Sequence, residues 1–215
     1  MTAHLTDFKV SYFSVPKCAC TSIKSMLFEA ENGFEWRDFK ANGQIHYVHS
    51  VYKSLPHEKT MRQCPEDHWK FAVLREPVSR LISCYKNRFM SGRGRKQINA
   101  KLEKVAELGL EARPDFDGFV THFEAYCDLA PDVRAHAVPT TRFLGEDAEY
   151  FDRIYTIKQL DEMRSDLKVR VPELPEMPHL QTRGKDVPVA APSKDSVARI
   201  EEIYARDYDI YSAFF

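Results

Sequence analysis

Short apolar runs alternate with amphipathic stretches along this chain. Residues 8–15, 70–74 and 153–157 are rich in β-branched and aromatic side chains, and we expect each run to form a buried strand. Elsewhere the hydrophobic positions recur at the spacing of a helix, which predicts helices over residues 21–31, from Pro77 onwards, and over 116–126, 160–167 and 193–206. Because strands that alternate with helices favour a parallel sheet, the pattern predicts an α/β fold.

Composition narrows the class of protein further. The chain has 215 residues, of which 43% are hydrophobic, and we expect one domain with its own core over residues 1–215. A net charge of −1 creates no field that favours nucleic acid as a partner. The N-terminus lacks a signal-peptide pattern and no apolar run reaches about 18 residues, so we expect a cytoplasmic protein without a membrane span.

The first candidate site lies where residues 8–15 run into the helix predicted from Thr21. The segment between them carries Lys17, and Thr21 and Ser22 open the helix. The N–H groups at a helix N-terminus attract anions, and a nearby lysine adds positive charge, so the segment has the outline of a phosphate-binding loop. The glycines of the pattern G-x-x-x-x-G-K-[ST] are absent, however. An ordinary turn with a solvated lysine is an equally good interpretation.

A second candidate site follows residues 70–74. Arg75 stands at the carboxyl end of this predicted strand, where α/β sheets bind ligands, and its planar guanidinium suits a phosphate dianion. On the helix that follows, Ser83 points away from the apolar stripe and could face the same anion. The alternative is a surface arginine paired with Glu76. A magnesium-dependent kinase would favour an aspartate at such a strand end, and arginine there argues against a nucleotide–magnesium site.

Together the two segments resemble a known family. VPKCACTSIK is similar to the 5′-phosphosulfate loop, and VLREPVSRLISCYKNRF to the 3′-phosphate motif, of family 2 sulfotransferases, the Golgi-type carbohydrate sulfotransferases and their bacterial relatives. These enzymes use 3′-phosphoadenylyl sulfate (PAPS) as donor. The resemblance implies a P-loop-like, three-layer α/β/α fold with a central, mainly parallel sheet. It also implies binding roles for Lys17, Cys18, Ala19, Cys20, Thr21 and Ser22 at the 5′ end, for Arg75 and Ser83 at the 3′-phosphate, and for Thr182, Arg183 and Gly184 over the 3′-phosphate and adenine.

The resemblance also places a histidine base between the two motifs. His46 and His49 lie there in an H-x-x-H segment, and His49 aligns better because Ser50 and an aromatic residue follow it. An imidazole with an ordinary pKa can accept a hydroxyl proton at neutral pH. Without the flanking motifs, a partly buried histidine with no catalytic role would be the better interpretation of either residue. His136 is a weaker third candidate.

These observations predict transfer of a sulfuryl group from PAPS to an acceptor hydroxyl, with carbohydrate as the expected acceptor class. A P-loop kinase acting on a small molecule and a non-catalytic nucleotide- or glycan-binding relative remain alternatives. The basic residues between 86 and 104 could steer an anionic glycan, or simply be solvated surface. Cys18 and Cys20 form C-x-C, but no second ligand pair accompanies them, so we predict no metal site.

Overall fold

The computed structural model describes residues 2–180 and 186–215. The chain divides into two compact units. The first consists of Met1–Arg75, Thr140–Gln181 and Ile210–Phe215, and the second of Glu76–Pro139 and Thr182–Asp209. The prediction of one domain over residues 1–215 stays a prediction, and each unit is described by itself.

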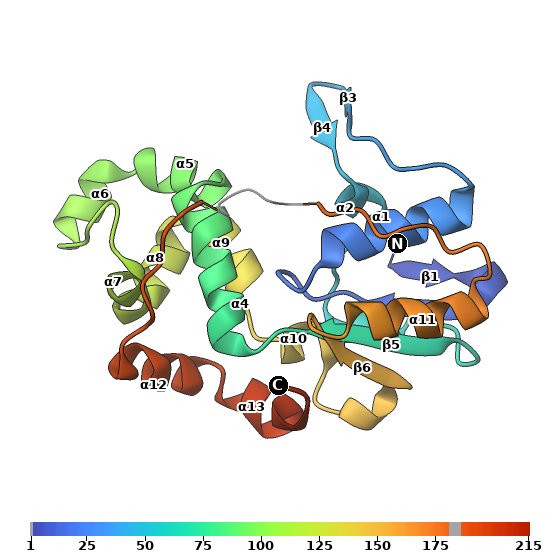
Figure 1. The fold of residues 1–215 in the computed structure, drawn as a ribbon. Coiled ribbons are helices and arrows are strands. Elements are labelled where there is room, and N and C mark those ends of the chain that lie inside the picture. The colour runs from blue at the N-terminus through green and yellow to red at the C-terminus, as the bar shows by residue number, and fades with distance from the viewer. Residues whose placement is uncertain (1, 181–185) are drawn as a thin grey trace. The chain divides into compact units, whose positions relative to one another are not determined.

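The first unit is built on a four-stranded sheet in the order β1-β2-β5-β6 (Figure 1). The three strands β2, β5 and β6 are parallel, whereas β1 pairs with β2 in the antiparallel direction. Their bounds are Ala3–Leu5 for β1, Val10–Phe13 for β2, Trp69–Leu74 for β5 and Arg153–Thr156 for β6. A mixed α/β fold with a central, mainly parallel sheet is therefore confirmed.

Alternating side chains of the strands build the core on the two faces of this sheet. On one face Tyr12 of β2 and Phe71 of β5 stack with their ring centroids 5.0 Å apart. They join one hydrophobic cluster with residues of α1 (Cys20–Asn32) and α11 (Leu160–Arg170). Phe13 points to the opposite face, because neighbouring residues of a strand alternate. There its ring contacts the rings of α3 (His57–Met61) and of the 3₁₀ turn η3 (Ala148–Tyr150).

A small antiparallel hairpin interrupts the first unit between α1 and α3. It consists of β3 (Phe39–Ala41) and β4 (Gln44–His46), and the helix α2 (Val48–Val51) follows it directly. The remaining elements of this unit are short: the 3₁₀ turns η1 (Thr6–Phe8) and η4 (Ser212–Phe214), and the helix α10 (Thr141–Leu144). The hairpin and α2 carry both candidate histidines.

The second unit is helical. Its elements are α4 (Pro77–Cys84), the π-helical turn η2 (Tyr85–Met90), α5 (Arg93–Asn99), α6 (Leu102–Glu107), α7 (Phe116–Thr121), α8 (Phe123–Leu129), α9 (Pro131–Ala137), α12 (Lys194–Ile203) and most of α13 (Ala205–Tyr211). Aromatic rings dominate its core, with Phe89 and Phe119 at 4.8 Å between centroids. Arg80 is also buried and donates hydrogen bonds to the carbonyls of Ala137 and Val138.

Most predicted elements appear close to the expected bounds. The helix predicted over 21–31 is α1, the one predicted over 160–167 is α11, and Ser193 caps α12 by accepting a hydrogen bond from the N–H of Ser196. The strand predicted over 8–15 is shorter, because residues 6–8 form a 3₁₀ turn. Neither β1 nor the hairpin of β3 and β4 was predicted.

Candidate active site

The segment between β2 and α1 reaches its shape without glycine. Lys17 and Ala19 have φ angles of +70° and +57°, in the left-handed region that glycine normally occupies. A side chain in this region costs about 1 kcal/mol or more. Ala19 is the N-cap of α1, and no side chain of the described residues caps this helix. The backbone thus adopts, without glycine, the angles that glycine normally supplies.

The first turn of α1 has backbone N–H groups that are not used by hydrogen bonds within the helix. The hydrogen bond from the N–H of Ile23 to the carbonyl of Ala19 closes the first helical turn at 3.1 Å. The N–H groups of Cys20, Thr21 and Ser22 precede it at the positive end of a 13-residue helix. An anion placed there meets the partial charge of the helix as well as these donors.

The strand register brings the two predicted anion sites to one edge of the sheet. β2 and β5 are parallel neighbours, with Phe13 opposite Ala72. Lys17 lies in the segment after the carboxyl end of β2, and Arg75 follows the carboxyl end of β5 directly. This edge is where ligands bind in open α/β sheets.

The other residues predicted for the 3′-phosphate are placed differently. Ser83 lies on α4 in the second unit and is half-buried. Glu76, the partner considered for Arg75, caps α4, and its carboxylate accepts hydrogen bonds from the N–H groups of Val78 and Ser79. Thr182, Arg183 and Gly184 lie outside the described residues. Binding of the 3′-phosphate by any of these residues stays a prediction.

His49 contacts the first turn of α1. Its Nε2 atom lies 2.9 Å from the Thr21 hydroxyl, and its Nδ1 atom lies 3.2 Å from Nζ of Lys24. Lys24 Nζ also donates a 2.9 Å hydrogen bond to the hydroxyl of Ser54, which lies 2.8 Å from the hydroxyl of Ser14. A continuous polar chain therefore runs from the helix start, through the imidazole, to the end of β2.

Lys24 is the unexpected member of this chain of polar contacts. It is fully buried, and burial of its ammonium group lowers its pKa from 10.5 to about 8. Nearby Cys20 acts in the opposite direction but more weakly. Among the residues that the structure describes, Lys24 forms no ion pair. Sequence reasoning missed it, although it lies three residues after Thr21 and therefore on the same face of α1.

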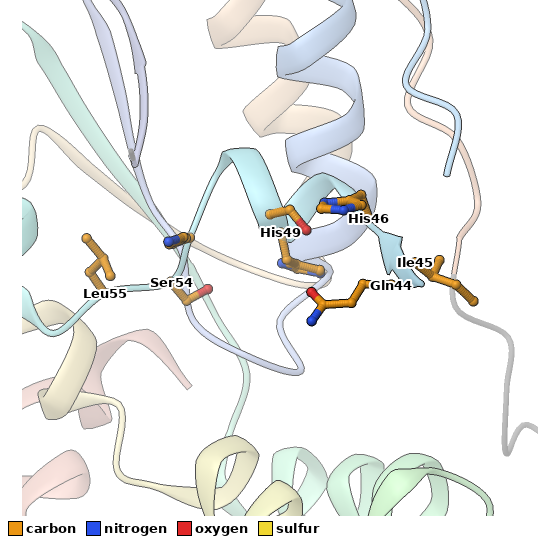
Figure 2. Close-up of a pocket in the computed structure, with 8 residues that line it drawn as sticks. Gln44, Ile45, His46, His49, Ser54 and Leu55 are labelled. Carbon is orange, nitrogen blue, oxygen red and sulfur yellow. The ribbon is translucent and has the colours of Figure 1, made fainter. Parts of the chain in front are cut away.

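A pocket of about 640 Å³ opens beside His49 (Figure 2). Its lining comes from β4, α2 and the segment after α2: Gln44, Ile45, His46, His49, Ser50, Lys53, Ser54 and Leu55. His46 lies on β4, where its ring stacks on Phe39 with centroids 5.0 Å apart. The structure therefore connects His49 with α1 and His46 with the hairpin.

The remaining predicted loop residues are buried or half-buried. Cys18 and Cys20 are buried free thiols, and the Cys18 thiol points to the carbonyl of Pro16 at 3.7 Å. The hydroxyl of Ser22 accepts a 3.2 Å hydrogen bond from the N–H of Leu180, so it also fixes the segment before the undescribed residues. These contacts help to fix the conformation of the loop.

His136 and the basic residues belong to the second unit. His136 lies on α9, and its Nδ1 atom is 2.7 Å from the carbonyl of Asp132. Arg88 lies 3.8 Å from the carboxylate of Asp132, and Arg95 donates to the carbonyl of Ala112. Two arginines of the basic segment thus have structural partners within the second unit.

The sequence was then compared with known proteins. It matches the model of the Sulfotransferase family over residues 4–213. The chain belongs to the sulfotransferase family. This confirms the family predicted from the two motifs, and it makes the protein a transferase of sulfuryl groups. Comparisons with curated proteins and with solved structures find no match.

Within residues 2–180 and 186–215, no group of three or more His, Cys, Asp or Glu side chains is arranged to hold a metal ion. None of the helices described is both long and apolar enough to cross a membrane.

Proposed function

We propose that this sulfotransferase transfers the sulfuryl group of PAPS to a hydroxyl of a carbohydrate by in-line displacement at sulfur. The observation that carries the proposal is the contact of 2.9 Å between His49 and Thr21. It joins a group that can accept a proton to the helix start that can hold the donor's phosphate. We also infer that the sheet and its helices correspond to the P-loop-like, three-layer arrangement of the family.

The loop and α1 hold the 5′ end of the donor in this proposal. The N–H groups from Ala19 to Ser22 and the Thr21 hydroxyl bind the 5′-phosphate and sulfuryl oxygens, and Lys17 neutralises their charge. Cys18, Ala19 and Cys20 are small enough for the donor to approach the backbone. The resemblance assigns recognition of the 3′-phosphate, which distinguishes PAPS from ATP, to Arg75 and Ser83, and a further binding role to Thr182, Arg183 and Gly184.

The chemical step then needs one base and one electrophilic group. His49 accepts the acceptor's hydroxyl proton as the acceptor oxygen forms its bond to sulfur. The bond between sulfur and the 5′-phosphate oxygen breaks, and its electron pair leaves with 3′,5′-ADP. Lys17 stabilises the charge that develops on that departing oxygen. No metal takes part in this scheme.

The pocket beside His49 is the proposed acceptor site. Its side chains offer hydrogen-bond donors and acceptors from Gln44, His46 and Ser50, and a positive charge from Lys53. A carbohydrate with free hydroxyls fits this lining, and Lys53 would favour an anionic glycan.

Calorimetry separates this proposal from a kinase. We expect 3′,5′-ADP to bind without metal, and ATP with magnesium to bind far more weakly. Tight ATP binding without 3′,5′-ADP binding would contradict the donor assignment. Turnover is then measured with labelled PAPS and a panel of glycans, lipids and small alcohols. Binding of 3′,5′-ADP without transfer to any acceptor would instead indicate a non-catalytic relative.

The choice of base is tested with a matched pair of variants. We expect His49→Ala to lose about 100-fold or more in kcat while 3′,5′-ADP still binds, since general bases contribute this much. His46→Ala should change KM for the acceptor more than kcat. Full activity of His49→Ala would transfer the role of base to His46 or His136.

A further inference from the structure

The ring hydrogen of neutral His49 can be on either nitrogen, and only one of the two tautomers can act as a base at Nε2. Nε2 faces the Thr21 hydroxyl, on the side where the helix start would hold the donor. To accept a proton there, Nε2 must carry a lone pair, and the ring hydrogen must then be on Nδ1. The partner of Nδ1 therefore decides whether His49 can act as the base.

That partner, at 3.2 Å, is Nζ of Lys24. A charged lysine has three hydrogens and no lone pair, so it can only donate to Nδ1. The ring hydrogen would then be on Nε2, and His49 would donate to Thr21 instead of accepting. A neutral lysine has one lone pair and two hydrogens. It can accept the Nδ1 hydrogen and still donate to the Ser54 hydroxyl at 2.9 Å.

We propose that Lys24 is the positioning residue of His49, and that its uncharged amine selects the tautomer in which Nε2 is the base. The inference rests on the proposed function of His49. In this state the amine lone pair also accepts the Nδ1 hydrogen of the imidazolium that forms when Nε2 takes the acceptor's proton, the position that a carboxylate occupies behind other catalytic histidines.

The surroundings of Lys24 favour the uncharged amine. Its side chain is fully buried, and its hydrogen-bond partners are neutral groups, namely the imidazole and the Ser54 hydroxyl. Removing an unpaired ammonium from water is costly, so burial lowers the pKa of Lys24 to about 8. With this pKa, about a tenth of the molecules carry the uncharged amine at about pH 7 and about half of them at about pH 8, so the base-competent fraction increases as the pH rises.

Other titratable groups surround the pair on several elements. Cys20 lies on the first turn of α1, and its thiolate would raise the pKa of Lys24. His46 of β4 and Lys53 after α2 line the same pocket as His49. Lys17 lies in the segment before α1. Since these groups can add their own pH dependence to activity, the decisive measurement must observe His49 itself.

NMR of the full chain labelled with ¹⁵N-histidine observes the tautomer directly and needs no substrate. His49→Gln identifies the two signals of this ring. We expect the hydrogen to move from Nε2 to Nδ1 as the pH rises through about 8, and this change to disappear in Lys24→Met. A hydrogen that stays on Nε2 on both sides of pH 8 would overturn the inference, whatever the activity.

Kinetics provide the second measurement. In the wild type we expect kcat/KM to rise through about pH 8. Lys24→Arg keeps a permanent donor next to Nδ1, so kcat should fall by about 100-fold or more at every pH. Lys59→Arg, at an exposed position of α3, is the control and should behave as wild type. An active Lys24→Arg enzyme would contradict the inference.

The two proposals can fail separately. A tautomer change without transfer to any acceptor would support the role of Lys24 and contradict the proposed function. Transfer from PAPS without a tautomer change would support the function and overturn the role of Lys24.

Discussion

Burial of Lys24 has a consequence for stability that can be measured without any substrate. An unfolded chain exposes this lysine, and its pKa there is 10.5, whereas in the folded protein it is about 8. The unfolded state therefore binds more protons between these two values, and stability must rise with pH in that window. Below about pH 8 Lys24 is charged in both states, and the folded state is destabilised by the full free-energy cost of burying the ammonium group. Above about pH 10.5 both are neutral and the cost disappears.

The size of the effect follows from the two pKa values. Each pKa unit corresponds to about 1.4 kcal/mol, so the charged form costs the folded state about 3 kcal/mol at low pH. At about pH 7 nearly all of this cost remains, and at about pH 9.5 roughly 1.4 kcal/mol of it is left. Lys24→Met has no such titration. We therefore expect the free energy of unfolding of the wild type, relative to Lys24→Met, to increase by about 2 kcal/mol between these two pH values.

Urea unfolding followed by tryptophan fluorescence is the appropriate assay. Trp36 and Trp69 are the only tryptophans of the chain, and both lie in the first unit with Lys24. Groups that do not interact with Lys24 titrate equally in both proteins, so their contributions cancel in the comparison. Lys59→Met is the control and should show no change relative to wild type. A difference between wild type and Lys24→Met that is the same at both pH values would refute the argument that burial lowers the pKa of Lys24.

Three further predictions concern the rest of the molecule. Lys17→Ala should lose sulfuryl transfer at saturating PAPS, whereas Arg75→Ala should mainly weaken 3′,5′-ADP binding; calorimetry and initial rates distinguish the two, and equal effects on both quantities would contradict the separate roles. Gly94→Ala should destabilise the second unit by about 1–3 kcal/mol, because a Cβ atom there would lie 2.5 Å from the Val133 side chain and 2.8 Å from the Arg88 carbonyl; an unchanged midpoint of urea unfolding by circular dichroism would be inconsistent with this. Ser193→Ala should lower the free energy of unfolding by about 1 kcal/mol, because α12 loses its N-cap, whereas Ser193→Asp should retain most of the stabilisation from the cap.

Long periodic segments were predictable from the sequence, and short ones were not. The apolar runs at β2, β5 and β6 and the helical spacing in α1 and α11 contain enough positions to distinguish strand from helix. β1, β3 and β4 have three residues each, which is too few for a period to appear. The hairpin is also largely exposed, so burial leaves no pattern in it.

The candidate site was also predictable only in part. The residues of the loop, Arg75 and His49 could be nominated because their positions follow strands or lie between two motifs. Lys24 could not, since a lysine in an amphipathic helix is expected to be solvated. Its burial depends on His49 and Ser54, which follow it in the chain at a distance of 25 and 30 residues. Only the folded chain brings these partners together.

The missing glycines were informative in a different way from the one expected. In the sequence their absence is a departure from the pattern G-x-x-x-x-G-K-[ST] of phosphate-binding loops. In the structure Lys17 and Ala19 adopt the left-handed backbone that glycine would supply. The sequence pattern and the backbone shape are therefore separable, and the shape persists because buried neighbours such as Cys18 hold it.

A loop without glycine at these positions can adopt few other backbone conformations. Glycine residues can sample many backbone angles in the free protein, whereas Lys17 and Ala19 are held in one narrow region by their neighbours. If this loop binds the nucleotide as proposed, binding requires little rearrangement of its backbone N–H groups. In stopped-flow experiments, association of 3′,5′-ADP should be a single phase whose rate increases linearly with concentration. Under the proposed function, the free enzyme would thus act as a rigid receptor for the 5′ end of the donor.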